Sequence, residues 1–401
     1  MSGLSKKYPI EIPVGMYYSG QWHESRSSNR IPIINPATEE EVGTFQDATI
    51  EDVKNAVESA KDAHNRGKWL GITPKEREDI LHKISELILE NRERLAYLET
   101  IDVGKPYNNA YSMDIVGAAR SFRYFAGWIT KIYGETTPVD PQFFNYTLRE
   151  PMGVVGVITP WNFPLASASK KIALSLATGN CVVFKPSEET VMTALELPMI
   201  LKEAGVPDGV FNLVTGFGET VGSEIVKSPD IDMISFTGHH ITGTIIQKSA
   251  SDTLKKCVLE LGGKSPNIVF DDANIEEAVN WSYKSAFFNQ GENCNAGTRL
   301  FLGRKIKERF LKKFIKLTNE TVVGDPFDNN STMGPMISRT HYDKVTGYIK
   351  YGEESSYDLL AGGSEELKSF NKGYFVSPTI FNSVPNDSKL AQEEIFGPVL
   401  S

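Results

Sequence analysis

The chain has 401 residues, of which 40% are apolar, 23% charged and 10% aromatic, and its formal net charge is −9. This composition is typical of a globular protein long enough for two or three domains. Acidic and basic residues are mixed along the chain, and no basic stripe suits a phosphate backbone. A nucleic-acid partner is therefore not expected.

The sequence also argues against a membrane or secretory protein. No apolar run reaches the length of a membrane span, and the first residues, "MSGLSKKYPIEIPVG", lack the apolar core of a signal peptide. A cytoplasmic location without membrane contact is expected. The cysteines Cys181, Cys257 and Cys294 should stay reduced there, and their wide spacing matches no metal-binding pattern, so no metal site is expected.

Three segments have the apolar spacing of amphipathic helices. Two lie near the start, at residues 51–66 and 74–99, and Pro74 suits the first turn of the second helix. The third, residues 305–316, is rich in lysine. It is more typical of a helix with one solvated face than of a membrane anchor.

After Pro151, short apolar runs alternate with helical patterns. The runs predict strands at 153–158, 181–184, 210–215, 232–236 and 257–261. Apolar strands that alternate with helices are typical of an α/β fold with a doubly wound, Rossmann-like parallel sheet. Ligands bind such sheets beyond the carboxyl ends of the strands.

Polar or glycine-rich turns follow four of these five strands. They are "TPWNFP" (159–164), "KPSEET" (185–190), "TGHHITG" (237–243) and "GGKSP" (262–266). Because the carboxyl ends of parallel strands share one edge, a binding site is expected there. A second α/β section starts at 267–270, while the proline-rich, aromatic stretch 136–151 indicates an extended arm outside the sheet.

Cys294 lies in "NQGENCNAGTR", among residues that are poor core material. A buried, inert cysteine is one interpretation. The other is a nucleophile, because backbone N–H groups in such a loop can activate a thiol. The residues alone leave both open.

Two further side chains have the chemistry of a catalytic site. Glu260 ends an apolar strand in "VLELGG", where burial would raise its pKa and make it a general base; the alternative is a carboxylate that accepts backbone hydrogen bonds. Asn162 lies between two prolines, where its amide could donate to an oxyanion or merely serve the turn. Lys185 and Glu188 could hold a ribose or be surface charges.

Together and in this order, these segments resemble the NAD(P)-dependent aldehyde dehydrogenase superfamily. The matching stretches are "TPWNFP", "KPSE", "FTG" with Gly243, "LELGGKSP", "NQGENCNAGTR" and "EEIFGPV", and they cover nearly the whole chain. The resemblance implies a small-molecule aldehyde as substrate and NAD as cofactor, with NADP possible. Glu188 should repel a 2′-phosphate and so favour NAD.

The resemblance implies a role for each catalytic residue. The Cys294 thiolate attacks the aldehyde, and the Asn162 amide and the Cys294 backbone N–H hold the thiohemiacetal oxyanion. Glu260 then activates the water that releases the acid from a thioester. Lys171 matches a family lysine that is often assigned to a proton relay. Lys170 matches a position near the substrate tunnel that is basic in some relatives, which hints at an anionic or hydroxylated aldehyde as substrate.

The resemblance assigns cofactor contacts to a longer set of residues. Lys185 and Glu188 would hold the adenine ribose, Glu394 the nicotinamide ribose, and Phe396 would flank the nicotinamide. The remaining positions are Thr159, Trp161, Ser187, Gly218, Phe236, Gly238 and Gly243.

Three features depart from the family pattern. His239-His240 replaces the usual Ser-Thr after "FTG", so a protonated His239 could add charge near the pyrophosphate. Glu292 replaces a common Gln and could raise the Cys294 pKa if it points inward. The chain also stops at "EEIFGPVLS", where the family continues, which indicates a truncated member.

The resemblance also implies a domain division. Residues 1–133 and 152–262 would form the NAD-binding domain, 134–151 an oligomerisation arm, and 263–401 a catalytic domain incomplete at its C-terminal end. A homodimer or homotetramer is expected for the full-length form. The rival functions are a CoA-acylating relative, against which Glu260 argues, and a catalytically silent structural member.

Overall fold

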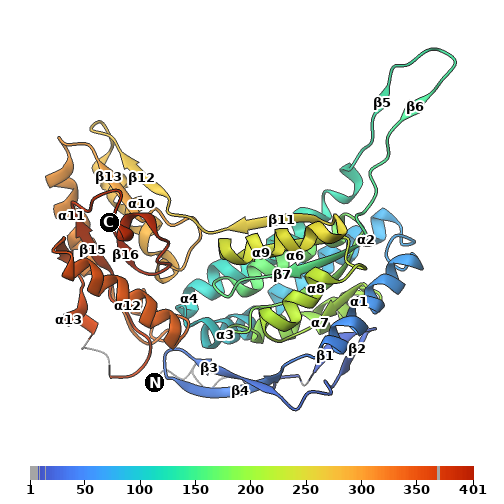
Figure 1. Cartoon of the computed structure of the whole chain (residues 1–401), viewed down its shortest axis with the longest axis horizontal. Helices are drawn as coiled ribbons and strands as arrows, with labels where there is room; N and C mark the ends of the chain where they lie inside the picture. Colours follow the sequence, from blue (N-terminus) through green and yellow to red (C-terminus); the bar gives the residue numbers. More distant parts are fainter. Residues whose placement is uncertain (1–7, 9, 14, 368–370) are drawn as a thin grey trace.

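The computed structural model describes residues 8, 10–13, 15–367 and 371–401, which form two lobes (Figure 1). The larger lobe contains a seven-stranded sheet with helices on both faces. The smaller lobe contains the chain from β12 onward, folded into two short sheets and their helices.

The large sheet has the strand order β11-β10-β7-β8-β9-β1-β2. Its parallel part consists of β7 (Val154–Ile158), β8 (Cys181–Lys185), β9 (Phe211–Leu213), β10 (Met233–Gly238) and β11 (Lys256–Leu261). The five predicted strands and the doubly wound parallel sheet are therefore confirmed. Two antiparallel strands that the sequence did not predict extend the sheet at one edge: β1 (Met16–Tyr18) and β2 (Gln21–His23).

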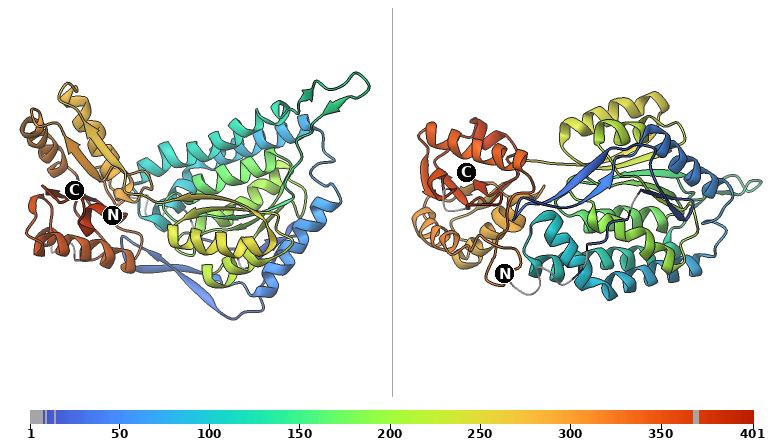
Figure 2. Two further views of the ribbon diagram at one scale, coloured as in Figure 1. Left: turned by 45° about the horizontal axis from the view of Figure 1, so that its top comes forward. Right: turned by 90° about the horizontal axis from the view of Figure 1, so that it is seen from below.

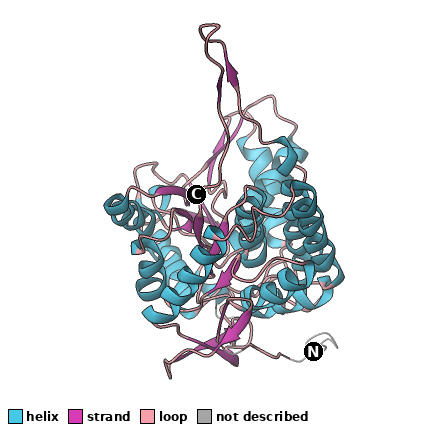
Figure 3. Cartoon of the chain, turned by 90° about the vertical axis from the view of Figure 1, so that its right-hand side faces the viewer, coloured by secondary structure: helices cyan, strands magenta, loops and turns pink. Residues whose placement is uncertain are grey.

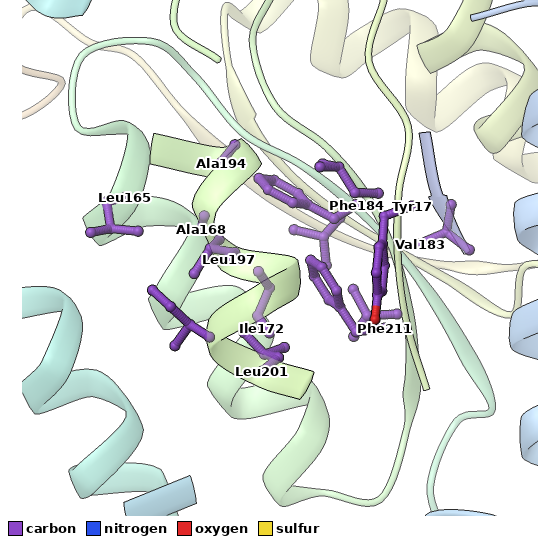
Figure 4. Packing of buried hydrophobic residues seen from close by; sticks show 14 of the residues in the cluster. Tyr17, Leu165, Ala168, Ile172, Val183, Phe184, Ala194, Leu197, Leu201 and Phe211 are labelled. Carbon is purple, nitrogen blue, oxygen red and sulfur yellow. The ribbon is translucent and has the colours of Figure 1, made fainter. Parts of the chain in front are cut away.

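Helices cover both faces of this sheet (Figure 2). One layer consists of α2 (Pro74–Glu90), α3 (Arg92–Val103), α5 (Ile115–Ala126), α6 (Pro164–Ala177) and α7 (Met192–Ala204). The other consists of α1 (Ile50–Asn65), α8 (Ser223–Lys227) and α9 (His240–Ala250). Apolar side chains of α6 and α7, such as Ile172 and Leu201, lie in one buried cluster with Phe184 and Phe211 of the sheet (Figure 4). The alternation of strand and helix in the sequence thus produces a core on each side of one sheet.

The predicted helix at 51–66 is confirmed as α1, but the predicted single helix at 74–99 is wrong. The structure has two helices there, because the chain bends at Asn91, which ends α2 and precedes α3. The Asn91 Nδ2 donates to the Leu87 carbonyl at 2.9 Å, and Arg92 Nε donates to the Tyr111 carbonyl at 2.7 Å. These contacts satisfy groups at the break, so tertiary structure overrides a continuous apolar period.

The smaller lobe begins directly after β11. Its strands are β12 (Pro266–Val269), β13 (Arg299–Leu302), β14 (Asp358–Ala361), β15 (Thr379–Asn382) and β16 (Val399–Leu400), and its helices are α10 (Ile275–Phe287), α11 (Lys307–Asn319), α12 (Arg339–Glu354), α13 (Ser364–Leu367) and α14 (Lys389–Gln392). The predicted lysine-rich helix is confirmed as α11, which buries Phe310 and Phe314 and exposes its charges.

Short helical segments connect these elements. They are α4 (Tyr107–Asn109), η2 (Ala110–Asp114), η3 (Ile129–Lys131), η4 (Gly218–Gly222), η5 (Ser251–Thr253) and η6 (Phe288–Gly291). Among the described residues, no helix is both long and apolar enough to span a bilayer.

A β-hairpin, β3 (Arg30–Asn35) with β4 (Glu40–Gln46), links the two lobes along one side (Figure 1). Its turn accepts a hydrogen bond from the Tyr374 N–H at the Pro36 carbonyl, 3.0 Å away, and Glu39 forms an ion pair with Arg339 at 2.9 Å. The hairpin therefore helps to fix the cleft that the lobes share.

A second hairpin, β5 (Thr136–Thr137) with β6 (Asn145–Tyr146), projects away from both lobes (Figure 3). Its apolar side chains lie in solvent in this single chain. Phe143 and Phe144 are 73% and 77% exposed. Water contact of this extent on two adjacent aromatic residues is typical of a surface that another protein covers.

Candidate active site

The turns after β7, β10 and β11 meet the smaller lobe around a cavity of about 240 Å³. Its lining includes eight residues that the sequence singled out: Trp161, Asn162, Gly238, His239, Glu260, Cys294, Glu394 and Phe396. These residues come from segments spread over more than half of the chain. The structure therefore brings the candidate thiol, carboxylate and amide to one cavity at the carboxyl edge of the sheet, where the strand order predicts a site.

Asn162 is 4% exposed and is held on both sides. Its side-chain Nδ2 donates to the Glu292 carbonyl at 2.9 Å, and its own backbone carbonyl accepts from Asn289 Nδ2 at 3.2 Å and from Lys105 Nζ at 3.0 Å. An amide nitrogen carries two N–H groups, so one remains for a group in the cavity. The pattern "PWNFP" thus produces a rigidly held donor rather than a solvent-exposed turn residue.

The segment before Cys294 contains three successive left-handed residues. Asn289, Gln290 and Gly291 have φ values of 52°, 59° and 74°. Asn289 Nδ2 also donates to the Glu292 carbonyl at 3.1 Å, so the same carbonyl accepts from both asparagines. Residues other than glycine and asparagine rarely adopt a backbone with positive φ. The backbone strain at Gln290 can persist only where surrounding contacts hold the chain in this conformation. The strained turn orients the carbonyl that fixes the Asn162 amide.

Cys294 lies in a turn and is exposed to the cavity. Partial burial of its thiol raises the pKa above its usual value, and the carboxylates of Glu394 and Glu260 raise it further. The Cys294 backbone N–H and that of Asn295 act in the opposite direction, because they stabilise a thiolate. The thiol of the free chain is therefore less acidic than the glycine-rich sequence around it suggested.

Glu260 lines the cavity from the end of β11, but it is exposed rather than buried. The expectation that Glu260 is buried is wrong, because β11 is an edge strand with an uncovered face. Lys171 lies behind it on α6 and donates to Ser235 Oγ at 3.0 Å. Burial lowers the Lys171 pKa to about 8, and the Glu260 charge opposes that shift, so the two groups interact electrostatically.

Glu292 does not point toward the thiol. Its side chain is fully buried, with Oε1 accepting from the Ile337 N–H at 3.1 Å and lying 3.7 Å from His341 Nε2. Burial raises the pKa of this carboxyl well above its usual range, which favours its neutral form. The acids that raise the Cys294 pKa are Glu394 and Glu260, so Glu292 does not have the effect on the thiol that its place in the sequence suggested.

His341 forms an aromatic corner of the cavity that the sequence analysis missed. Its ring centroid lies 5.2 Å from that of Trp161 and 6.2 Å from that of Phe396. His341 Nε2 lies 2.6 Å from the Phe396 carbonyl, which can only accept, so Nε2 carries the proton. Burial lowers the His341 pKa to about 4. The imidazole is thus a neutral donor whose hydrogen bond holds the Phe396 backbone in place. Phe396 has a φ of 61°, in the left-handed region that residues other than glycine rarely adopt.

Lys344, three residues further along α12, was also missed. It lines the cavity with Glu394, whose Oε1 accepts from the Gly263 N–H at 3.1 Å. Burial lowers the pKa of Lys344, while Glu394 and Glu393 raise it. The only sequence signal for these residues is the helix start "SRTHYDK", capped by Ser338, which places His341 and Lys344 on one helical face.

The other predicted cofactor residues lie outside this cavity, along the same edge of the sheet. Lys185 ends β8 and is almost fully buried, and its Nζ contacts Glu188 Oε2 at 2.9 Å. The Thr159 N–H donates to the Lys185 carbonyl at 3.2 Å, and Ser187 is buried beside them. Gly218 begins η4 and is exposed.

Phe236 and Gly243 complete the predicted set, and Gly238, which lines the cavity, lies beside Phe236 on β10. Phe236 and Gly238 share one face of β10, and a Cβ on Gly238 would come within 2.5 Å of the Phe236 ring. Gly243 lies in the first turns of α9, where a Cβ would come within 2.7 Å of Leu261. Gly243 therefore permits close packing of α9 on β11. Lys170, the predicted substrate residue, is exposed on α6 and does not line the cavity.

His239 borders the cavity as the N-cap of α9, where its Nδ1 accepts from the Ile241 N–H at 3.4 Å. Burial, His240 and Lys344 lower its pKa, although Glu394 opposes this shift. A neutral ring with an unprotonated Nδ1 fits both observations. These surroundings disfavour a protonated His239, and the hypothesis that its charge acts near the pyrophosphate stays a prediction that a pH titration tests.

We expect His239 to leave NAD affinity insensitive to pH. The ratio of the NAD dissociation constants of His239→Asn and the unsubstituted chain should change little between about pH 7.5 and 6.5, because burial and nearby positive charge lower the His239 pKa and disfavour its protonated form. Asparagine keeps an N-cap acceptor, so α9 should begin as before. Tryptophan fluorescence titration measures both constants. A ratio that rises steadily on acidification would contradict the neutral assignment.

Comparisons with known proteins agree with this geometry. The model of the "Aldehyde dehydrogenase family" matches residues 22–401. A mitochondrial aldehyde dehydrogenase of Mesocricetus auratus is 41% identical over 387 residues, which are 96% of this chain and 77% of the relative. Human aldehyde dehydrogenase 1A1 is 42% identical over 386 residues, covering 96% and 76%. The NAD+ complex of a Bacillus cereus aldehyde dehydrogenase superposes with a TM-score of 0.95 at 40% identity, covering 100% and 81%.

The chain belongs to the aldehyde dehydrogenase family. Membership confirms the predicted class of enzyme, an NAD(P)-dependent aldehyde dehydrogenase with a Rossmann-like sheet and NAD as cofactor. The CoA-acylating and silent alternatives are not favoured.

Proposed function

We propose that this chain oxidises a small aldehyde at Cys294 and releases the carboxylic acid through Glu260. The observation that carries the proposal is the convergence of Cys294, Glu260 and Asn162 on one cavity of about 240 Å³. A thiol, a carboxylate and an amide donor are the groups that thioester chemistry needs in one place.

The first step uses Cys294 and Asn162. The exposed thiol gives up its proton to solvent water, the sulfur forms a bond to the carbonyl carbon, and the electron pair of the carbonyl π bond moves to the oxygen, which becomes an oxyanion. The free N–H of the Asn162 amide and the Cys294 backbone N–H are the donors proposed to hold this oxyanion. Loss of one such donor typically costs about 3–4 kcal/mol of transition-state stabilisation.

The chain's residues suit NAD by their chemistry. The proposed contacts are the carboxylates of Glu188 and Glu394 with ribose hydroxyls and the Phe396 ring beside the nicotinamide. Trp161 and the start of α9 are proposed to lie near the pyrophosphate. When bound, NAD+ supplies the acceptor for the hydride that leaves the thiohemiacetal carbon. A carboxylate at Glu188 repels a 2′-phosphate, which favours NAD over NADP.

Glu260 is proposed to complete the reaction. Its carboxylate takes a proton from water, the oxygen forms a bond to the thioester carbon, and the carbon–sulfur bond breaks to return the Cys294 thiolate. The cavity position of Glu260 and its electrostatic contact with Lys171 support this role. Lys171 would then act as a second proton site, as the resemblance implies.

Replacement of Glu260 should separate the two halves of the reaction. In Glu260→Gln, steady-state NADH formation should fall about 100-fold, while one equivalent of NADH per active site still forms rapidly, because the amide cannot accept the water proton. Stopped-flow absorbance measures both phases. Hydroxylamine, a nucleophile that needs no base, should restore turnover. Equal loss of the rapid phase and of turnover would contradict the assignment.

Product analysis tests the proposed function as a whole. The enzyme should convert aldehyde and NAD+ to equimolar NADH and carboxylic acid, and added CoA should change neither the rate nor the product. Acyl-CoA as the main product would favour the acylating rival. An absence of NADH with every aldehyde offered would favour a silent member.

Predictions about assembly, domains and location extend this proposal. The exposed aromatic residues of the β5–β6 hairpin support an oligomerisation arm at 134–151 and a homodimer or homotetramer. Separate apolar clusters, one built almost entirely from residues 16–246 and two from residues 269–400, support the division into 1–133 with 152–262 and 263–401. A cytoplasmic location stays a prediction, since some relatives are named as mitochondrial.

A further inference from the structure

Asn162, whose amide is the proposed oxyanion donor, accepts a hydrogen bond at its backbone carbonyl from a buried lysine outside the cavity. Lys105 follows α3 and is 1% exposed. Its Nζ donates to the Asn162 backbone carbonyl at 3.0 Å and to Asp114 Oδ2 at 2.6 Å, and it lies 4.3 Å from the centre of the Phe163 ring. A buried lysine without a partner would be neutralised or expelled, so this one is held by specific contacts.

The charges around Lys105 are balanced by one carboxylate. Asp114 provides the short contact, whereas Glu99 Oε1 lies 3.7 Å from Nζ. Burial raises the pKa of Glu99 to about 8, although the Lys105 charge opposes this shift. Burial thus favours the neutral form of Glu99, which leaves Asp114 as the close carboxylate partner of Lys105. The Lys105 charge is therefore paired with a carboxylate, and the lysine can hold a fixed position in the interior.

Lys105, Asn162, Asn289 and the Glu292 carbonyl form one connected hydrogen-bond network. Lys105 and Asn289 both donate to the Asn162 carbonyl, and Asn289 and Asn162 both donate to the Glu292 carbonyl. The two lone pairs of each carbonyl are therefore used, and the peptide plane of Asn162 cannot rotate without breaking a charged hydrogen bond. The direction of the free amide N–H depends on that plane.

We propose that Lys105 is a positioning residue that aims the Asn162 amide at the oxyanion. This inference rests on the proposed function, because it gives Lys105 an effect only through Asn162. Preorganised donors act when they already point to the place where charge develops, and a misplacement of about 1 Å can cost 100-fold in rate. Asp114 contributes to the same positioning, since it holds the Lys105 ammonium group in place.

The test is a double-mutant cycle on the full chain. Lys105→Met should lower kcat about 10- to 100-fold, with the KM values for aldehyde and NAD within about threefold. Asn162→Ala should lower kcat at least as much, and the variant with both substitutions should be no slower than Asn162→Ala alone. Lys105→Met with Asp114→Asn removes both charges together and provides a second variant should the single change fold poorly.

Controls separate positioning from folding. Lys255→Met removes another buried lysine, which contacts the Ser228 carbonyl away from the cavity, and it should keep kcat within about twofold. All rates are expressed per NAD-binding site, measured by calorimetric titration. A wild-type kcat in Lys105→Met, or full multiplicative loss in the double variant, would overturn the role of Lys105. A wild-type kcat in Asn162→Ala would instead overturn the oxyanion role itself and this inference with it.

Discussion

Replacement of Cys294 by serine should lower NADH formation at least about 1,000-fold. A serine hydroxyl remains protonated at neutral pH, and alkoxide is a poorer leaving group than thiolate. NAD should still bind, because the cofactor contacts proposed here come from other residues. NADH absorbance with a simple aldehyde measures the rate, and tryptophan fluorescence measures the binding.

The chain provides a matched control for this substitution. Cys257 lies near the start of β11, the strand that also carries Glu260, and is half-buried. Cys257→Ser should retain the wild-type rate within about twofold, since it changes sulfur to oxygen away from the cavity. Residual activity of about one-tenth or more in Cys294→Ser would show that the thiol is not the nucleophile.

The raised Cys294 pKa adds a pH dependence to this prediction. Only the thiolate reacts with iodoacetamide, and in the absence of NAD the pKa lies above its usual value because of burial, Glu394 and Glu260. Alkylation of the free chain should therefore accelerate about tenfold for each pH unit between pH 7 and 8. Glu394→Gln should speed alkylation at about pH 7, because it removes a negative charge that disfavours the thiolate.

The parallel sheet could be predicted because its signals are local. Each strand is a short apolar run, and each turn after a strand carries its polar residues in sequence. Since parallel strands end at one edge, strand order along the chain was enough to expect that Asn162 and Glu260 approach each other. Cys294, which comes from the smaller lobe, could be joined to them only through the family resemblance.

The missed features depend on contacts between distant segments. Lys105 and His341 have no local pattern that marks them, since a lysine before proline and a histidine in a first helical turn are ordinary surface residues. Both acquire their roles from burial beside partners far away in sequence, Asn162 and Phe396. The wrong expectation for Glu260 has the same origin, because its exposure depends on what covers an edge strand rather than on the apolar letters around it.

Replacement of Asn162 by alanine should lower kcat about 100- to 1,000-fold, the range for loss of one oxyanion donor. KM for the aldehyde should change much less, because the donor acts on charge that develops only in the transition state. Asn162→Asp should be slower still. It removes the donor and adds a carboxylate beside the place where the oxyanion forms. Steady-state NADH formation with varied aldehyde separates kcat from KM.

Asn180 offers the matched control, because it is also 4% exposed and also holds a turn, through its Oδ1 and the Gly153 N–H at 2.9 Å. Asn180→Ala should lower the thermal midpoint as Asn162→Ala does, since each loses buried hydrogen bonds worth about 1 kcal/mol apiece. Only Asn162→Ala should lower kcat per NAD-binding site. Equal kcat losses in both variants would mean that the asparagine matters for stability alone, and the free N–H at the cavity would then have no part in the chemistry.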